Sequence, residues 1–89
     1  MNFGLHIGQQ NLTIDEIRRL WRWTDTAGFD WVDVWDHFYE APYINGDASC
    51  FEAISCMSAI ACETQNVRIG VLVLGMGYRN PAVLTKSLC

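Results

Sequence analysis

The sequence lacks several features that define whole classes of proteins. Basic side chains are few, with six Lys and Arg against ten Asp and Glu, so no basic stripe is available to neutralise nucleic-acid phosphates. The longest apolar run, residues 69–76, is far shorter than the roughly 18 residues that a membrane-spanning helix needs. No secretory signal pattern occurs near the first residues. These absences predict a cytoplasmic protein that binds neither nucleic acid nor membrane.

The four cysteines also lack the CxxC spacing that is typical of redox and metal motifs. Cys50, Cys56 and Cys62 follow one another at six-residue intervals, so on a helix with ~100° per residue they point in three different directions. This spacing excludes a single metal site built from these three side chains. Together with Cys89 they predict free thiols in a reducing compartment.

The residues that are present are typical of a folded domain. Hydrophobic residues make up 51% of the sequence and charged residues 18%, a balance that argues against intrinsic disorder. A length of 89 residues corresponds to one domain at most, or to a part of one. The four tryptophans present large apolar surfaces that need cover, so we assign them to the core.

Apolar runs and helical patterns alternate along the sequence. The apolar runs, each predicted to be a strand, cover residues 2–7, 31–35 and 67–74. The helical patterns that follow them cover residues 13–27, 50–63 and 80–89. A long loop over residues 36–49 separates the second strand from the second helix, and a loop of this length in a compact fold is more often functional than not.

Local signals mark where two of the predicted helices begin and where the first one ends. Thr13 and Glu16 have the spacing of a capping box, and Gly28 suits a left-handed turn after the first helix. Asn80 and Pro81 are residue types that are preferred just before a helix and at its first position. These helix boundaries are therefore predicted from local chemistry as well as from periodicity.

The order of the elements predicts an α/β fold with a parallel sheet. Strands that alternate with helices are joined by right-handed crossovers, as in barrels and doubly wound folds. The third run is apolar at nearly every position from Ile69, as in a parallel strand that is covered on both faces. A TIM (β/α)8 barrel needs about 250 residues and eight units. Residues 1–89 are therefore predicted to form the first three units, a β-α-β-α-β-α amino-terminal portion that does not close the barrel.

Polar and ring-bearing residues follow two of the predicted strands. Trp35-Asp36-His37-Phe38 comes after the second strand, and residues 75–81 come after the third. Parallel β/α folds place their chemistry at the carboxyl ends of the strands, so this position favours a catalytic or binding role for His37. The motif Gly75-x-Gly77 is not a phosphate-binding fingerprint, because the third glycine is missing.

Six blocks of residues, in this order and spacing, resemble the amino-terminal part of bacterial luciferase-like oxidoreductases. The resemblance covers nearly the whole sequence and is closest to the branch that uses the deazaflavin coenzyme F-420 rather than FMN. The blocks are Phe3-Gly4-Leu5, Ala27-Gly28-Phe29-Asp30, Asp36-His37-Phe38, Glu52, Val67-Arg68-Ile69-Gly70 and Tyr78-Arg79-Asn80-Pro81-Ala82-Val83-Leu84.

The resemblance implies a partial luciferase-like domain over residues 1–89, with a cofactor ring at the carboxyl ends of the strands. It implies redox chemistry on a small organic substrate, either hydride transfer with F-420 or oxygen insertion with reduced FMN. His37 matches the histidine that faces the ring and is the implied catalytic residue, with Asp36 beside it. The Leu72-Val73 peptide aligns with a non-proline cis bond in a bulge that backs the ring. Asp36, His37, Leu72 and Val73 are thus the implied cofactor-binding residues.

Several polar residues allow two interpretations. Asp36 either orients the neighbouring histidine or caps a turn, and Glu52 either contacts the site or places a negative charge at the start of a helix. Arg79 fits a structural role better than a ligand-binding one. His6 is more consistent with interior packing than with catalysis. Asp33 lies in the middle of a predicted strand and therefore needs a partner or a water molecule.

Family members usually continue into a fourth strand after this helix, and this sequence does not. Phosphate groups in TIM barrels are usually held by loops after the seventh and eighth strands. The alternative to an enzyme is therefore a non-catalytic remnant, or a homo-oligomer that covers its own open sheet edges.

Overall fold

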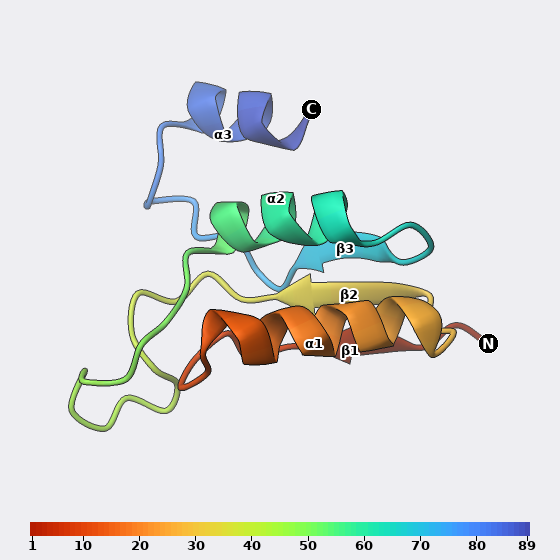
Figure 1. The fold of residues 1–89 in the computed structure, drawn as a ribbon. Coiled ribbons are helices and arrows are strands. Elements are labelled where there is room, and N and C mark those ends of the chain that lie inside the picture. Colours follow the sequence, from red (N-terminus) through yellow and green to blue (C-terminus); the bar gives the residue numbers. More distant parts are fainter.

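The computed structural model describes residues 1–89 and shows strands and helices in strict alternation (Figure 1). The strands pair in parallel in the order β1-β2-β3, which confirms the predicted α/β class and the open parallel sheet. Helices α1 and α2 lie over the same face of this sheet, and α3 lies beyond α2 (Figure 1). The elements are β1 (Gly4–His6), α1 (Ile14–Thr26), β2 (Trp31–Val34), α2 (Ala53–Glu63), β3 (Arg68–Val71) and α3 (Pro81–Leu88).

Helices α1 and α3 begin at the predicted caps. In α1, the Glu16 N–H donates to Thr13 Oγ1 at 3.3 Å and the Thr13 N–H donates to Glu16 Oε2 at 2.8 Å, which closes the capping box. Gly28 follows this helix with a φ of 87°, a conformation that only glycine adopts without steric cost. Asn80 caps α3, because its Oδ1 accepts from the Ala82 N–H at 2.9 Å.

All the elements are shorter than predicted, and the differences are largest for β1, β3 and α2. Strand β3 ends at Val71, and the next residue, Leu72, donates its N–H to the Val34 carbonyl at 2.8 Å before the chain leaves the sheet. Helix α2 begins at Ala53, because the preceding Phe51 donates its N–H to the Gln9 carbonyl at 3.0 Å and so continues a bridge rather than a helix. Strand β1 pairs only over Gly4–His6.

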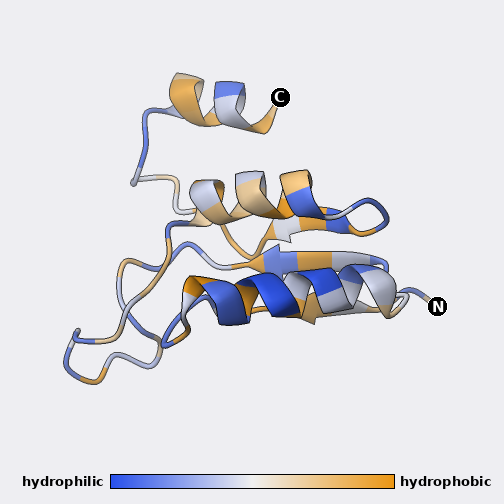
Figure 2. Ribbon diagram, viewed as in Figure 1, coloured by the Kyte–Doolittle hydropathy of each residue, from blue (hydrophilic) through white to orange (hydrophobic).

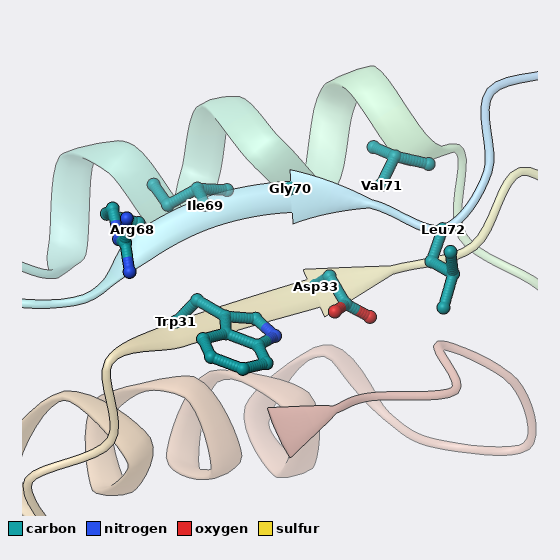
Figure 3. Close-up of a pocket in the computed structure, with 7 residues that line it drawn as sticks. All are labelled: Trp31, Asp33, Arg68, Ile69, Gly70, Val71 and Leu72. Atoms are coloured by element: carbon teal, nitrogen blue, oxygen red, sulfur yellow. The ribbon is translucent and has the colours of Figure 1, made fainter. Parts of the chain in front are cut away.

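The core lies between the sheet and the two helices that cover it. Val32 and Val34 of β2 are fully buried against Ile17 and Trp21 of α1 and Ile60 of α2. The alternate β2 residues point to the opposite face, where Trp31 and Asp33 border a hollow of about 420 Å³ (Figure 3). This face carries no helix, so it stays open to solvent in the present chain.

The tryptophan prediction is correct only for Trp21, which is fully buried. Trp23 lies two residues further along the same helix, which turns it ~200° away from the core, and it is 54% exposed. Trp31 and Trp35 are half-buried because their rings lie on the uncovered face of the sheet.

The prediction that His6 packs in the interior is wrong for this chain. His6 is exposed because its side chain points to the uncovered face, beside that of the Asp33 with which it is in register. His6 Nδ1 and Asp33 Oδ1 form a close contact, so the expected need of Asp33 for a partner is met by this histidine. The interaction links β1 to β2 on the face opposite the core.

One carboxylate joins the two covering helices. Glu63 at the end of α2 accepts hydrogen bonds from Arg18 Nη2 at 2.6 Å, Trp21 Nε1 at 2.7 Å and Arg22 Nη2 at 2.9 Å. Hydrogen bonding to Arg18, helped by the other two donors, outweighs the opposing effect of burial and lowers the pKa of Glu63 from its usual 4.5 to about 2. In Figure 2 the ribbon of α1 carries blue, hydrophilic bands on its turns.

This pKa predicts a pH-dependent contribution of Glu63 to stability. Because the folded-state pKa is depressed, the stabilisation is complete above about pH 4.5 and is lost as the pH falls toward 2. We expect Glu63→Gln to unfold at lower urea than the unmodified protein at pH 6, and the gap between them to close over that range. Both proteins share every other carboxylate, so the difference isolates Glu63. A gap that is independent of pH would contradict this assignment.

Candidate functional site

The loops that follow β2 and β3 meet at the carboxyl edge of the sheet, as the sequence predicted. The Gly75 N–H donates to Asp36 Oδ2 at 2.9 Å, which joins the two loops directly. The Leu72 N–H donates to the Val34 carbonyl just below this point. His37 and the Leu72-Val73 peptide therefore follow strand ends that are hydrogen-bonded neighbours.

An ionic network fixes this edge. Arg79 donates from Nη1 to Asp36 Oδ2 at 2.6 Å and from Nη2 to Asp36 Oδ1 at 2.7 Å, a bidentate pair, and it also contacts Glu52. The Asp36 side chain is 5% exposed and that of Arg79 is 20% exposed, so the pair is shielded from water. The guanidinium thus connects the loop after β2, the start of α2 and the segment before α3.

Asp36 serves mainly as the partner of Arg79, a role that neither sequence-based interpretation of Asp36 included. No hydrogen bond joins Asp36 to His37; its two oxygens accept from Arg79, and one also accepts from the Gly75 N–H, where the turn closed by the Tyr78 N–H and the Gly75 carbonyl begins. The Arg79 hydrogen bonds hold the pKa of Asp36 below its usual range despite burial. The prediction that Arg79 is structural agrees with this geometry.

Glu52 has both of the roles that the sequence allowed, as a helix cap and as a contact at the site. Its carboxylate accepts from the Ile54 N–H at 3.1 Å and the Ser55 N–H at 2.7 Å, which caps α2. The same carboxylate contacts Arg79 at the site edge. Burial alone would raise the pKa of Glu52, but these hydrogen bonds outweigh burial and lower it.

His37 is exposed, and its ring packs edge-on against Trp35 with centroids 4.9 Å apart. Trp35 in turn packs against His6 at 5.7 Å. The Cys50 thiol donates to the His37 carbonyl at 3.5 Å, and burial raises the pKa of this thiol, so it stays protonated and able to donate. The backbone and one side of the His37 ring are therefore held, while the exposed part of the imidazole can reach a bound molecule.

Leu72 and Val73 present apolar side chains to solvent beside this edge. They are 60% and 68% exposed, and the peptide bond between them is cis, as the family resemblance implied. Met76 in the next turn is 75% exposed. Phe38 and Tyr78, one from each loop, pack together with ring centroids 4.3 Å apart. The edge thus combines an exposed imidazole with an exposed apolar and aromatic surface.

Sequence reasoning missed two glutamines at this site. Gln9 and Gln10 lie between the first predicted strand and the first predicted helix, where polar residues are unremarkable, but the Gln9 side chain is fully buried and bonds to the backbone of Trp35. Gln10 bonds in the same way to the backbone of Ala41. Their partners are 26 and 31 residues away, so no local spacing in the sequence reveals them.

Glu40 organises the far part of the loop over residues 36–49. Its Oε1 accepts from the N–H groups of Ile44, Asn45 and Gly46, the last at 2.7 Å. These backbone donors lower the pKa of Glu40, first those of Asn45 and Gly46. The loop is therefore folded around a carboxylate of its own.

No group of three or more His, Cys, Asp or Glu side chains is placed to hold a metal ion. None of the helices combines the length and the apolar character that crossing a bilayer requires.

An open parallel sheet with helices on one face and polar loops at its carboxyl edge corresponds to part of a β/α barrel. The chain belongs to the luciferase-like monooxygenase family, because it matches the model of that family over residues 1–88. This is a family of oxidoreductases, and the match confirms the family resemblance seen in the sequence. No curated protein matches the chain.

Comparison with solved structures confirms the fold. The chain is similar to an F-420-dependent secondary alcohol dehydrogenase in complex with an F-420–acetone adduct, with a TM-score of 0.83 and 22% sequence identity. The likeness covers 97% of this chain but 26% of that structure, so the chain spans about a quarter of its length. At this level of identity the likeness establishes the architecture.

Proposed function

We propose that this chain supplies one wall of the ring pocket in an F-420- or flavin-dependent oxidoreductase that acts on small organic substrates. The observation that carries the proposal is the shared edge at which the His37 imidazole and the Leu72 and Val73 side chains are exposed. The F-420 dependence of the dehydrogenase of similar fold supports a deazaflavin over FMN. Hydride transfer and oxygen insertion are both compatible with this wall.

The exposed residues fit a flat aromatic ring rather than a charged group. Leu72 and Val73 offer apolar surface that would pack against one face of the ring, and His37 offers a hydrogen-bonding group beside them. By contrast, Arg79, the cation at this edge, is already committed to Asp36 and Glu52. The edge therefore fits the ring portion of the cofactor, and the phosphate portion needs partners outside it.

The chemistry divides between the cofactor and the residues of this chain. When bound, a reduced deazaflavin or flavin supplies the electrons for reduction. His37 can donate a hydrogen bond in its neutral form, or supply a proton in its protonated form, because its ring is exposed and not committed to Asp36. The Asp36–Arg79 pair holds the two loops so that His37 and Leu72 stay at one edge.

Replacement of His37 tests this role in an active enzyme that carries these residues. We expect His37→Ala to lower the rate of the cofactor redox step by about 10²-fold or more, as is typical of general acid–base groups. His37→Gln, which keeps a hydrogen-bond donor but cannot exchange a proton at neutral pH, should recover only part of the rate. Stopped-flow measurement of cofactor absorbance provides the readout. An unchanged rate with unchanged cofactor affinity would reduce His37 to a loop residue.

A second candidate, a non-catalytic chain that self-associates, is favoured by the open sheet. The outer edges of β1 and β3 have no strand partner, and unpaired edges promote association between chains. The hollow beside Asp33 and Gly70 is also open on the uncovered face (Figure 3). In this case a second copy would pair with the free edge of β1 or β3, and the carboxyl edge would show no affinity for a cofactor ring.

A further inference from the structure

The side chain of Gln9 forms a complete hydrogen-bonded pair with the backbone of Trp35. The Trp35 N–H donates to Gln9 Oε1 at 3.0 Å, and Gln9 Nε2 donates to the Trp35 carbonyl. The same Nε2 donates to the Phe51 carbonyl at 3.2 Å. Gln9 is fully buried, so these bonds are shielded from water and the amide cannot exchange them for solvent.

Gln10 repeats the arrangement six residues further along the loop. The Ala41 N–H donates to Gln10 Oε1 at 2.8 Å, and Gln10 Nε2 donates to the Ala41 carbonyl at 3.2 Å. Each glutamine amide thus pairs with both backbone groups of one loop residue, as a neighbouring β-strand would. The segment from Trp35 to Ala41, which carries His37, is fastened at both ends.

The backbone of residues 9–11 also holds the far end of the loop over residues 36–49. The Asn11 N–H donates to the Ser49 carbonyl at 3.0 Å, and the Phe51 N–H donates to the Gln9 carbonyl at 3.0 Å. Cys50, which forms an antiparallel bridge with Gln10, donates its thiol hydrogen to the His37 carbonyl. We call residues Gln9–Asn11 the glutamine bracket.

A long loop without such fastenings would sample many conformations, and its histidine would hold no fixed position. Here Trp35 and Ala41, which lie on either side of His37 in the sequence, are held by the side-chain amides of Gln9 and Gln10. Trp35 also packs directly on the His37 ring. The bracket therefore controls both the backbone around His37 and the aromatic surface against its imidazole.

We infer that Gln9 and Gln10 are positioning residues for His37. They do not reach the ring pocket themselves; they fix the loop from which the imidazole extends. Only the catalytic role of His37 in this inference rests on the proposed function. The placement of the loop by the bracket is a property of the chain alone, and it can be tested without any cofactor.

The test compares Gln9→Met and Gln10→Met, which keep the side-chain length and remove the amide, with Gln65→Met as the matched control. Gln65 is exposed in the turn before β3, and only its backbone N–H is bonded, to Asp25. Hydrogen exchange by mass spectrometry reports the loop, and NMR of the chain with ¹³C-labelled histidine reports the His37 ring. That signal is sensitive to Trp35 because an aromatic ring current shifts nearby protons.

We expect Gln9→Met and Gln10→Met to speed amide exchange over residues 35–41 by about tenfold or more, because buried backbone groups lose their partners. The His37 signal should move toward its unfolded position, while α1 keeps its protection. Gln65→Met should change neither readout. Because Gln10 is only partly buried, its variant also tests the bracket if Gln9→Met does not fold.

Unchanged loop exchange and an unchanged His37 signal in Gln10→Met would overturn the inference. Equal acceleration in α1 and the loop would overturn it too, because the glutamines would then be ordinary core residues. Neither result bears on cofactor binding. A chain with an intact bracket that fails to bind a cofactor ring at His37 would instead refute the proposed function alone.

Discussion

Trp21→Ala is expected to remove most of the cooperative unfolding transition. Trp21 is fully buried where α1 meets the sheet, among Ile17, Val32 and Ile60. Truncating a buried aromatic side chain costs about 3–5 kcal/mol, because the lost apolar contact is followed by an incompletely filled cavity. Small domains have a free energy of unfolding of only about 5–15 kcal/mol, so this single change consumes much of it. Urea unfolding followed by far-UV circular dichroism measures the loss.

Trp23→Ala is the matched control on the same helix. Trp23 is 54% exposed and packs on Phe29 with ring centroids 5.5 Å apart, so its loss should cost about 1 kcal/mol or less. Trp21→Phe separates packing from hydrogen bonding, since it keeps an aromatic ring but removes the donor to Glu63. The free energy of unfolding of Trp21→Phe should lie between that of the unmodified protein and that of Trp21→Ala. Equal losses at Trp21 and Trp23 would contradict the placement of the core.

Arg79→Met is expected to destabilise the chain by about 3 kcal/mol, because it leaves the buried carboxylate of Asp36 without its partner. The loops after β2 and β3 should also lose protection from hydrogen exchange, since Arg79 joins them. Asp36→Asn removes the charge that would be left unpaired. The double variant Asp36→Asn/Arg79→Met should therefore cost less than the sum of the two single changes.

Arg19→Met provides the control for the loss of an arginine. Arg19 is exposed on α1, so its replacement should change stability by roughly 0.5 kcal/mol or less. If Arg79→Met cost no more than this, the network at the carboxyl edge would be a solvated ion pair of little energetic value. It could not then be what holds the two loops together.

Features encoded within a few residues were predictable from the sequence. The Thr13–Glu16 box, the glycine after α1 and the Asn80 cap are contacts over four residues or fewer, and the structure contains each of them. The alternation of strands and helices then left a parallel sheet as the consistent arrangement. The position of His37 at the carboxyl edge followed from that topology.

The contacts that complete the site were not predictable in the same way. Arg79 and Asp36 are 43 residues apart, and Gln9 and Trp35 are 26 apart, so their pairing depends on how the strands align. A glutamine in a polar loop looks the same whether it is solvated or buried. The error at His6 has a related cause, because the sequence does not reveal which face of the sheet lacks a helix.

The central claim is that His37, Leu72 and Val73 form one wall of a cofactor-ring pocket. Its direct test is NMR titration of the chain, labelled with ¹³C in histidine and in leucine and valine methyl groups, with FMN and with coenzyme F-420. Inorganic phosphate is the control for the charged part of the cofactor. The three labelled residues report the wall itself, and His6 reports the uncovered sheet face.

We expect both cofactors to shift the signals of His37, Leu72 and Val73 progressively, and phosphate to leave them unchanged. The shifts should not saturate below about 1 mM, because a ring contact without phosphate partners supplies only ~4 kcal/mol of binding free energy. Saturation at micromolar cofactor would contradict the account by showing a self-sufficient binding module. Unchanged signals at all three residues with several millimolar cofactor would also contradict it, and would leave the self-associating chain as the better explanation.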